Sequence, residues 1–176
     1  SETKEIEDLI IQIKNPLQRL SEHPYWYGEK LEYYSTQIQD SDKKGFDYSY
    51  GNRLREYFGT DQISEVISRL KKNTNTRRAV METIDHILDN ENDEIPCILV
   101  IQFRIRNNKL NTSVFWRSND IWGAYYPNIA ALSGIIDLIT KEINVDVGTL
   151  VTHAGSAHIY EVNFEEAQNY INKKGV

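Results

Sequence analysis

The sequence predicts an α+β fold in which helices pack on a mixed, mostly antiparallel sheet. Three patterns predict this class. Apolar and polar residues alternate along 97–106 and again along 109–117, as they do in strands with one buried face. Asn107-Asn108 lies between these segments and is typical of a short hairpin turn. In 128–143, apolar residues recur at helical spacing, which predicts a long and largely buried helix.

Length and charge limit the kind of protein. The chain has 176 residues, the usual size of one domain, so we expect 1–176 to form a single domain. A net charge of −6 argues against a nucleic-acid polymer as partner, because such proteins usually carry a basic face. The longest mostly apolar run, 129–139, is too short and too polar to span a membrane. One cysteine excludes an internal disulfide and favours a reducing compartment, so we expect a cytoplasmic protein.

The N-terminal part is predicted to hold two helices. Segment 2–13 has its apolar residues on one helical face and acidic residues near its start. Those apolar residues are Ile6, Leu9, Ile10 and Ile13. Residues 17–50 are polar, rich in tyrosine and irregular in pattern, so neither helix nor strand is predicted there. Asp61 is a good N-cap, and it predicts a helix that ends at Lys72.

Later segments are predicted mainly as strands. A strand is expected over 79–84, after a loop at 73–76. In 97–106 the strict alternation predicts one face made of Cys97, Leu99, Ile101, Phe103 and Ile105, with Ile98 and Val100 on the other. A strand with an interruption at Gly155 is predicted over 148–160, and Asn163 is expected to cap a last helix.

Cys97 and Arg117 form the first candidate pair. If the strands pair around Asn107-Asn108, Cys97 and Arg117 lie near the same end of the sheet. A nearby guanidinium favours the thiolate and so activates a cysteine as a nucleophile. Spacing alone favours the alternative, a buried and inert thiol, because free cysteines are commonly buried.

Two further groups suit a phosphate. Arg77 and Arg78 are adjacent, and a guanidinium fork matches phosphate oxygens. Arg117 and Ser118 offer a guanidinium beside a hydroxyl. In each case a solvated surface charge is an equally good explanation.

The remaining candidates are polar groups near apolar elements. Asn128 is expected to cap the helix that follows it, although its amide also offers a donor and an acceptor to a ligand. His158 and Tyr160 share one face of a strand; a half-buried aromatic pair is favoured over a site for a sugar hydroxyl. The histidines lack metal-ligand spacing, so no metal site is predicted.

The order of these motifs resembles that of the thymidylate synthase family across about residues 46–170. The motifs, in order, are Tyr48-Ser49-Tyr50-Gly51, Arg77-Arg78, Pro96-Cys97, Arg117-Ser118-x-Asp120, Pro127-Asn128 and Gly155-x-Ala157-His158-Ile159-Tyr160. Several motifs in one order are far more specific than any one of them.

The resemblance implies a reaction and a set of roles. Cys97 would attack C6 of dUMP, and C5 would take a one-carbon unit to give dTMP. The donor would be a reduced pterin, either 5,10-methylenetetrahydrofolate or methylenetetrahydromethanopterin. A homodimer that pairs through the sheet and shares its active sites is also implied. The remaining roles are phosphate binding for Arg117 and Ser118 and, across the dimer, Arg77 and Arg78; uracil recognition for Asn128; sugar binding for His158 and Tyr160; pterin binding for Asp120; and proton removal for Tyr50.

Departures from the family pattern suggest a short, archaeal-type member. Ile98 stands where the family usually has His, Trp116 where it has Gln, and Ser156 where it has an acidic residue. Two alternatives stay open: a pyrimidine nucleotide hydroxymethylase, in which water quenches the C5-methylene intermediate, and a non-catalytic nucleotide-binding homologue.

Overall fold

The computed structural model describes residues 2–19, 23–43, 48–92 and 94–175. Its strands are β1 (Thr3–Ile13), β2 (Ala79–Glu82), β3 (Ile98–Arg106), β4 (Lys109–Asp120) and β5 (Asp146–Tyr160). Its α-helices are α1 (Gly28–Gln37), α2 (Tyr50–Asn52), α3 (Gln62–Lys72), α4 (Tyr125–Ile143) and α5 (Phe164–Lys174). A π-helical turn η1 (Arg53–Tyr57) and 3₁₀ turns η2 (Asp89–Glu91) and η3 (Glu161–Asn163) complete the elements.

Within the described residues, five strands form one sheet in the order β1-β5-β4-β3-β2. β4 and β5 pair in parallel, and every other neighbouring pair is antiparallel. The connection from β4 to β5 runs through α4, as a parallel pair requires a crossover. The predicted class, a mixed and mostly antiparallel sheet with helices packed on it, is therefore confirmed.

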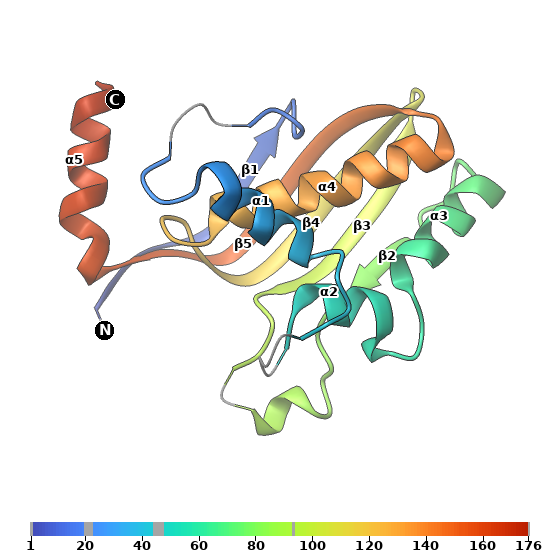
Figure 1. Ribbon diagram of the computed structural model, residues 1–176, viewed down its shortest axis with the longest axis horizontal. Helices are drawn as coiled ribbons and strands as arrows, with labels where there is room; N and C mark the ends of the chain where they lie inside the picture. Colours follow the sequence, from blue (N-terminus) through green and yellow to red (C-terminus); the bar gives the residue numbers. More distant parts are fainter. Residues whose placement is uncertain (1, 20–22, 44–47, 93, 176) are drawn as a thin grey trace.

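Helix α4 is the centre of the core. It lies across one face of the sheet, and α1 packs on it (Figure 1). Residues on several sides of α4 are buried, including Ile129, Leu132, Ile135 and Ile139. The helix ends at Asn144, whose φ of 55° is the left-handed conformation common at helix C-termini. A helix covered on two sides needs the nearly continuous apolar sequence seen here.

The prediction of a helix over 2–13 is wrong, because β1 occupies Thr3–Ile13. β1 pairs antiparallel with β5 from Thr3 opposite Tyr160 to Ile13 opposite Leu150. Ile6 and Ile10, two of the residues that suggested a helical face, are 61% and 62% exposed. The spacing of apolar residues was thus misleading, and hydrogen bonding to a distant strand decided the conformation.

Irregular structure over 17–50 is also a wrong prediction, because α1 spans Gly28–Gln37. Its buried residues include Leu31 and Ser35, and Ile38 follows at the C-cap. Their spacing of four and three positions is the helical signal that the polar surroundings hid.

The face prediction for β3 is wrong at its start. Ile98 is fully buried, as are Ile101 and Phe103, whereas Val100 is 38% exposed. A register shift between Ile98 and Val100 in the pairing with β4 explains this, because a bulge changes which residues share a face. The Cys97 and Ile98 side chains therefore do not follow the strict alternation of the strand.

The other predicted elements hold with adjusted ends. Asp61 caps α3, and its carboxylate accepts hydrogen bonds from the N–H groups of Ile63 and Ser64. Asn163 precedes α5 as predicted, but its side chain makes no capping hydrogen bond. The predicted interruption of the last strand at Gly155 is wrong, because β5 runs through this residue. A Cβ at this glycine would lie 3.2 Å from the carbonyl oxygen of Arg117, so glycine permits close approach of β4.

Candidate active site

Cys97 and Arg117 lie side by side at one end of the sheet. The N–H of Arg117 donates to the carbonyl oxygen of Cys97 at 2.9 Å. The Arg117 guanidinium donates through Nε to Pro96 O at 3.1 Å and through Nη2 to Ile95 O at 2.8 Å. The predicted pairing of the two strands is confirmed, and Arg117 holds the segment that presents the thiol.

The Cys97 side chain is half-buried, and burial raises the pKa of its thiol above the usual value. Arg117 lowers the pKa of the thiol, and the carboxylate of Glu94 raises it. Arg117 therefore favours the thiolate, as predicted, but its effect is smaller than that of burial. The neutral thiol is the main form of Cys97 at neutral pH.

Two tyrosines lie close to Cys97. Tyr50 begins α2, and its hydroxyl accepts a hydrogen bond from the N–H of Ile98 at 3.2 Å. The ring centroids of Tyr48 and Tyr50 are 5.8 Å apart. Burial is the main cause that raises the pKa of both phenols, so each keeps its proton at neutral pH. A protonated hydroxyl thus lies near the Cys97 thiol.

The start of α2, where Tyr50 lies, packs closely on the last residue of α1 and on the segment just after it. The hydroxyl of Ser49 caps α2 by accepting from the N–H of Asn52. A Cβ at Gly51 would overlap the carbonyl oxygens of Gln37 and Asp40, so the glycine after Tyr50 allows the two segments to meet.

Ser118, His158 and Tyr160 come together where β4 and β5 run in parallel. Ser118 Oγ lies 3.3 Å from His158 Nδ1. The rings of His158 and Tyr160 are 4.9 Å apart and nearly perpendicular. The parallel register also sets Asp120 beside His158. This end of the sheet presents a hydroxyl, an imidazole and a phenol to one region.

The two carboxylate oxygens of Asp120 differ in their hydrogen bonding. Oδ1 accepts from the N–H groups of Trp122 and Gly123 at 3.1 and 3.0 Å. Across the described residues, Oδ2 makes no hydrogen bond. A Cβ at Gly123 would overlap Oδ2, so a side chain there would displace this carboxylate oxygen. One oxygen thus shapes the loop before α4 and the other can accept from a ligand.

The prediction that Asn128 caps α4 is wrong. The helix begins at Tyr125, so Asn128 lies within it, and its N–H donates to Ala124 O at 3.1 Å. Its side-chain Oδ1 accepts a hydrogen bond from the hydroxyl of Tyr34 at 2.8 Å. Tyr34 was missed from the sequence because α1, which carries it, was not predicted.

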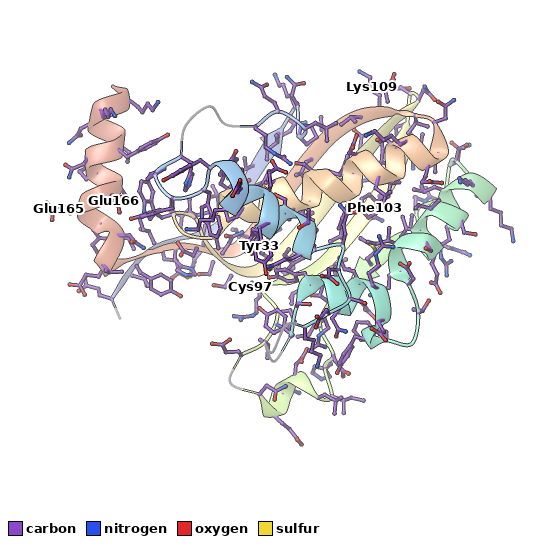
Figure 2. All side chains as sticks on the ribbon, viewed as in Figure 1. Tyr33, Cys97, Phe103, Lys109, Glu165 and Glu166 are labelled. Atoms are coloured by element: carbon purple, nitrogen blue, oxygen red, sulfur yellow. The ribbon has the colours of Figure 1, made fainter. Side chains whose placement is uncertain are left out.

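Arg77 and Arg78 are not brought to Cys97 within one chain. They precede β2, and Ala79 at its start pairs with Phe103. Phe103 is six positions along the chain from Cys97, which is a length of about 20 Å in a strand; Figure 2 labels both residues. The two arginines line a basic groove of about 700 Å³ together with Arg69, Lys72, Asn73, Asn75 and Thr76.

The part of the chain that the structure describes has neither a metal-binding cluster nor a membrane-spanning helix. No cluster of three or more His, Cys, Asp or Glu side chains has metal-ligand geometry there. None of the described helices has the length and apolar character needed to cross a membrane.

The fold is that of a thymidylate synthase. The crystal structure of thymidylate synthase from T4 phage superposes on the chain with a TM-score of 0.74 at 21% sequence identity. The match covers 96% of this chain and 71% of the phage protein.

Sequence comparison identifies the family directly. The family model described as thymidylate synthase matches residues 6–175. A provisionally named thymidylate synthase of Methanothermobacter marburgensis is 44% identical over 185 residues, which cover 96% of this chain and 83% of that protein. A protein of the same provisional name from Methanosarcina barkeri is 35% identical, over 100% of this chain and 82% of its own length. The chain belongs to the thymidylate synthase family and is similar to its short archaeal members.

Proposed function

We propose that the protein transfers a one-carbon unit from a methylene-carrying reduced pterin to C5 of dUMP, giving dTMP through a covalent adduct of Cys97 at C6. The observation that carries this proposal is the position of the Cys97 thiol. The thiol lies close enough to the guanidinium of Arg117 and to the protonated hydroxyl of Tyr50 for each pair to interact electrostatically. This arrangement joins a nucleophile to an anion-binding group and a proton carrier, in a chain of the thymidylate synthase family.

Covalent addition explains why this chemistry needs a thiol. The Cys97 thiolate adds to C6, and the electron pair of the C5–C6 double bond moves toward C5 and the O4 carbonyl. C5 then forms a bond to the methylene carbon as a bond from that carbon to a pterin nitrogen breaks. Tyr50 assists removal of the C5 proton, the remaining carbon–nitrogen bond breaks, and a hydride from the pterin reduces the C5-methylene to a methyl group. Breakage of the S–C6 bond restores the thiolate. A thiolate suits both the addition to C6 and the final elimination, because it is a good nucleophile and a good leaving group.

The polar residues at the same end of the sheet suit a nucleotide. Arg117 and Ser118 bind the phosphate, for which guanidinium and hydroxyl groups are good donors. His158 and Tyr160 bind the sugar hydroxyl, and Asn128 binds the O4/N3 edge of uracil. Binding energy from the phosphate and sugar then holds C6 against the thiol sulfur.

Asp120 is the proposed pterin ligand. A pterin presents N–H donors along its pyrimidine edge, and Oδ2 of Asp120 has no hydrogen bond to any described residue. When bound, the pterin supplies the methylene carbon and, in the synthase reaction, a hydride. The carrier is 5,10-methylenetetrahydrofolate or methylenetetrahydromethanopterin, and a reducing, cytoplasmic compartment suits both it and a free thiol.

A homodimer that pairs through the open face of the sheet is part of the proposal. Val80, Val100 and Phe115 are each at least 38% exposed on β2, β3 and β4, and α4 covers the other face. Pairing of two such faces buries this apolar surface. It also gives Arg77 and Arg78 a role. They lie about 20 Å from the Cys97 of their own chain, and in the dimer they bind the phosphate in the partner's site.

Release of tritium from dUMP labelled at C5 tests the proposal. The protein is incubated with labelled dUMP, with and without each methylene-carrying pterin, beside Cys97→Ser as the matched control. We expect carrier-dependent release by the wild type and none by the variant. If the protein binds dUMP but releases no tritium with either carrier, the proposed catalysis is contradicted and the protein is a nucleotide-binding homologue. Release with a 5-hydroxymethyl product indicates the hydroxymethylase.

A further inference from the structure

The Asn128 amide has one end bound within the protein and one end free. Oδ1 accepts from the Tyr34 hydroxyl at 2.8 Å. No described residue accepts a hydrogen bond from Nδ2. The side chain is 95% buried by the protein, since the residue is 5% exposed. Because both ends of a buried amide need partners, the free N–H₂ is available to a ligand.

Packing against Trp26 restricts the directions in which the Tyr34 hydroxyl can donate a hydrogen bond. Its ring packs against that of Trp26, with centroids 5.1 Å apart and planes at 60°. The indole N–H of Trp26 donates to Gly123 O at 2.8 Å, which ties it to the loop before α4. Burial is the main cause that raises the pKa of Tyr34 to about 12, so its hydroxyl remains a donor at neutral pH.

Amide orientation decides which pyrimidine edge fits. Uracil offers an acceptor at O4 and a donor at N3, and cytosine offers the reverse, a donor at N4 and an acceptor at N3. An amide with its N–H₂ toward position 4 therefore fits uracil, and the flipped amide fits cytosine. Flipping Asn128 turns its N–H₂ toward Tyr34 and leaves the Tyr34 proton without its acceptor.

We propose that Tyr34 is a positioning residue that fixes the orientation of the Asn128 amide and so makes the site prefer uracil to cytosine. This inference rests on the proposed role of Asn128 as the reader of the pyrimidine edge. Tyr34 does not touch the reacting atoms, and its effect passes through Asn128. Tyr34, on α1, is thus a second determinant of the preference for uracil, in addition to the Asn128 amide.

Nucleotide binding without turnover tests the inference. Dissociation constants of dUMP and dCMP are measured by calorimetry for the wild type and for Tyr34→Phe, which keeps the ring and removes the hydroxyl. Losing one hydrogen bond to a buried amide lowers the preference for dUMP by roughly tenfold. Tyr33→Phe is the matched control, since it removes a phenol from the neighbouring position of α1, where the side chain is 59% exposed. It leaves the ratio unchanged.

The ratio of the two constants separates orientation from general damage. A loosened α1 weakens both nucleotides equally, so an unchanged ratio in Tyr34→Phe overturns the inference. The Asn128→Asp background adds a second test, because a carboxylate has two equivalent oxygens and no orientation to fix. Adding Tyr34→Phe to Asn128→Asp leaves the ratio unchanged; a further tenfold drop there overturns the inference. If the wild type binds neither nucleotide, the proposed function itself fails.

Discussion

Reactivity of the Cys97 thiol depends on two charges of opposite sign. Arg117 lowers the pKa of Cys97, and Glu94 raises it. We therefore expect Arg117→Ala to slow alkylation of Cys97 by iodoacetamide at neutral pH and Glu94→Gln to speed it. Only the thiolate reacts, so the rate follows the fraction of Cys97 that is ionised.

The size of each effect follows from Coulomb's law. Taking a separation of about 6 Å and an effective dielectric constant of about 40 to 80, one charge contributes about 0.7 to 1.4 kcal/mol. That energy changes the thiolate fraction about three- to tenfold. Because Cys97 has a raised pKa, the rate continues to increase with pH beyond the point where an ordinary thiol levels off.

The assay measures alkylation by mass spectrometry across a pH series at low and high salt. Glu94→Gln is the cleaner variant, because Glu94 is exposed, whereas Arg117 also binds the carbonyl oxygens of Ile95 and Pro96. Raising the salt concentration reduces the difference between wild type and Glu94→Gln, since exposed charges are screened. Equal rates for all three proteins at low salt refute the electrostatic argument. Faster alkylation in Arg117→Ala shows that loosening of the 95–96 segment outweighs the lost charge.

Three further predictions concern the framework of the site. Asp89→Asn removes the partner of Arg53 in a fully buried ion pair, and we expect a loss of about 3 to 5 kcal/mol in urea unfolding; a loss below 1 kcal/mol contradicts this. Asp61→Ala removes the N-cap of α3, and the same measurement should show a loss of about 1 kcal/mol. Gly155→Val crowds the carbonyl oxygen of Arg117. We expect the free energy of dUMP binding, measured by calorimetry, to fall by more than the free energy of unfolding, and an unchanged dUMP affinity contradicts the close approach of the two strands.

Local signals were sufficient for much of the fold. The hairpin of β3 and β4 follows from alternation around Asn107-Asn108, and both asparagines adopt the positive φ that such turns need. The N-cap of α3 follows from Asp61 and the core helix from its apolar repeat. These features depend on residues close in sequence, so a single sequence contains the information.

Features that depend on distant partners were not predictable in this way. β1 is a strand because β5 pairs with it, although the two are more than 130 residues apart. Likewise, Cys97 and Arg117 were placed together by the hairpin, but the hydroxyls of Tyr34 and Tyr50 reach Asn128 and Ile98 through tertiary packing alone. The raised pKa of Cys97 depends on burial, which no motif encodes.

Two departures from the family pattern are one structural feature. Ile98 replaces the usual His and Trp116 the usual Gln, and the register of β3 and β4 pairs these two residues directly. Both side chains are 0% exposed and lie in the hydrophobic core, so an apolar cross-strand pair stands where the family usually has a polar one. The bulge that follows Ile98 lets its side chain enter the core while the backbone still presents the half-buried thiol of Cys97.

This pairing bears on whether the chemistry survives the substitutions. A polar residue restored at one position alone is buried against an apolar partner, at a loss of about 1 to 3 kcal/mol when it finds no hydrogen bond. The two side chains therefore match in polarity, except for the buried indole N–H of Trp116, which has no hydrogen-bond partner among the described residues. Arg117 and Tyr50 hold the 95–98 segment through hydrogen bonds to its backbone, and these bonds do not depend on which side chain stands at position 98.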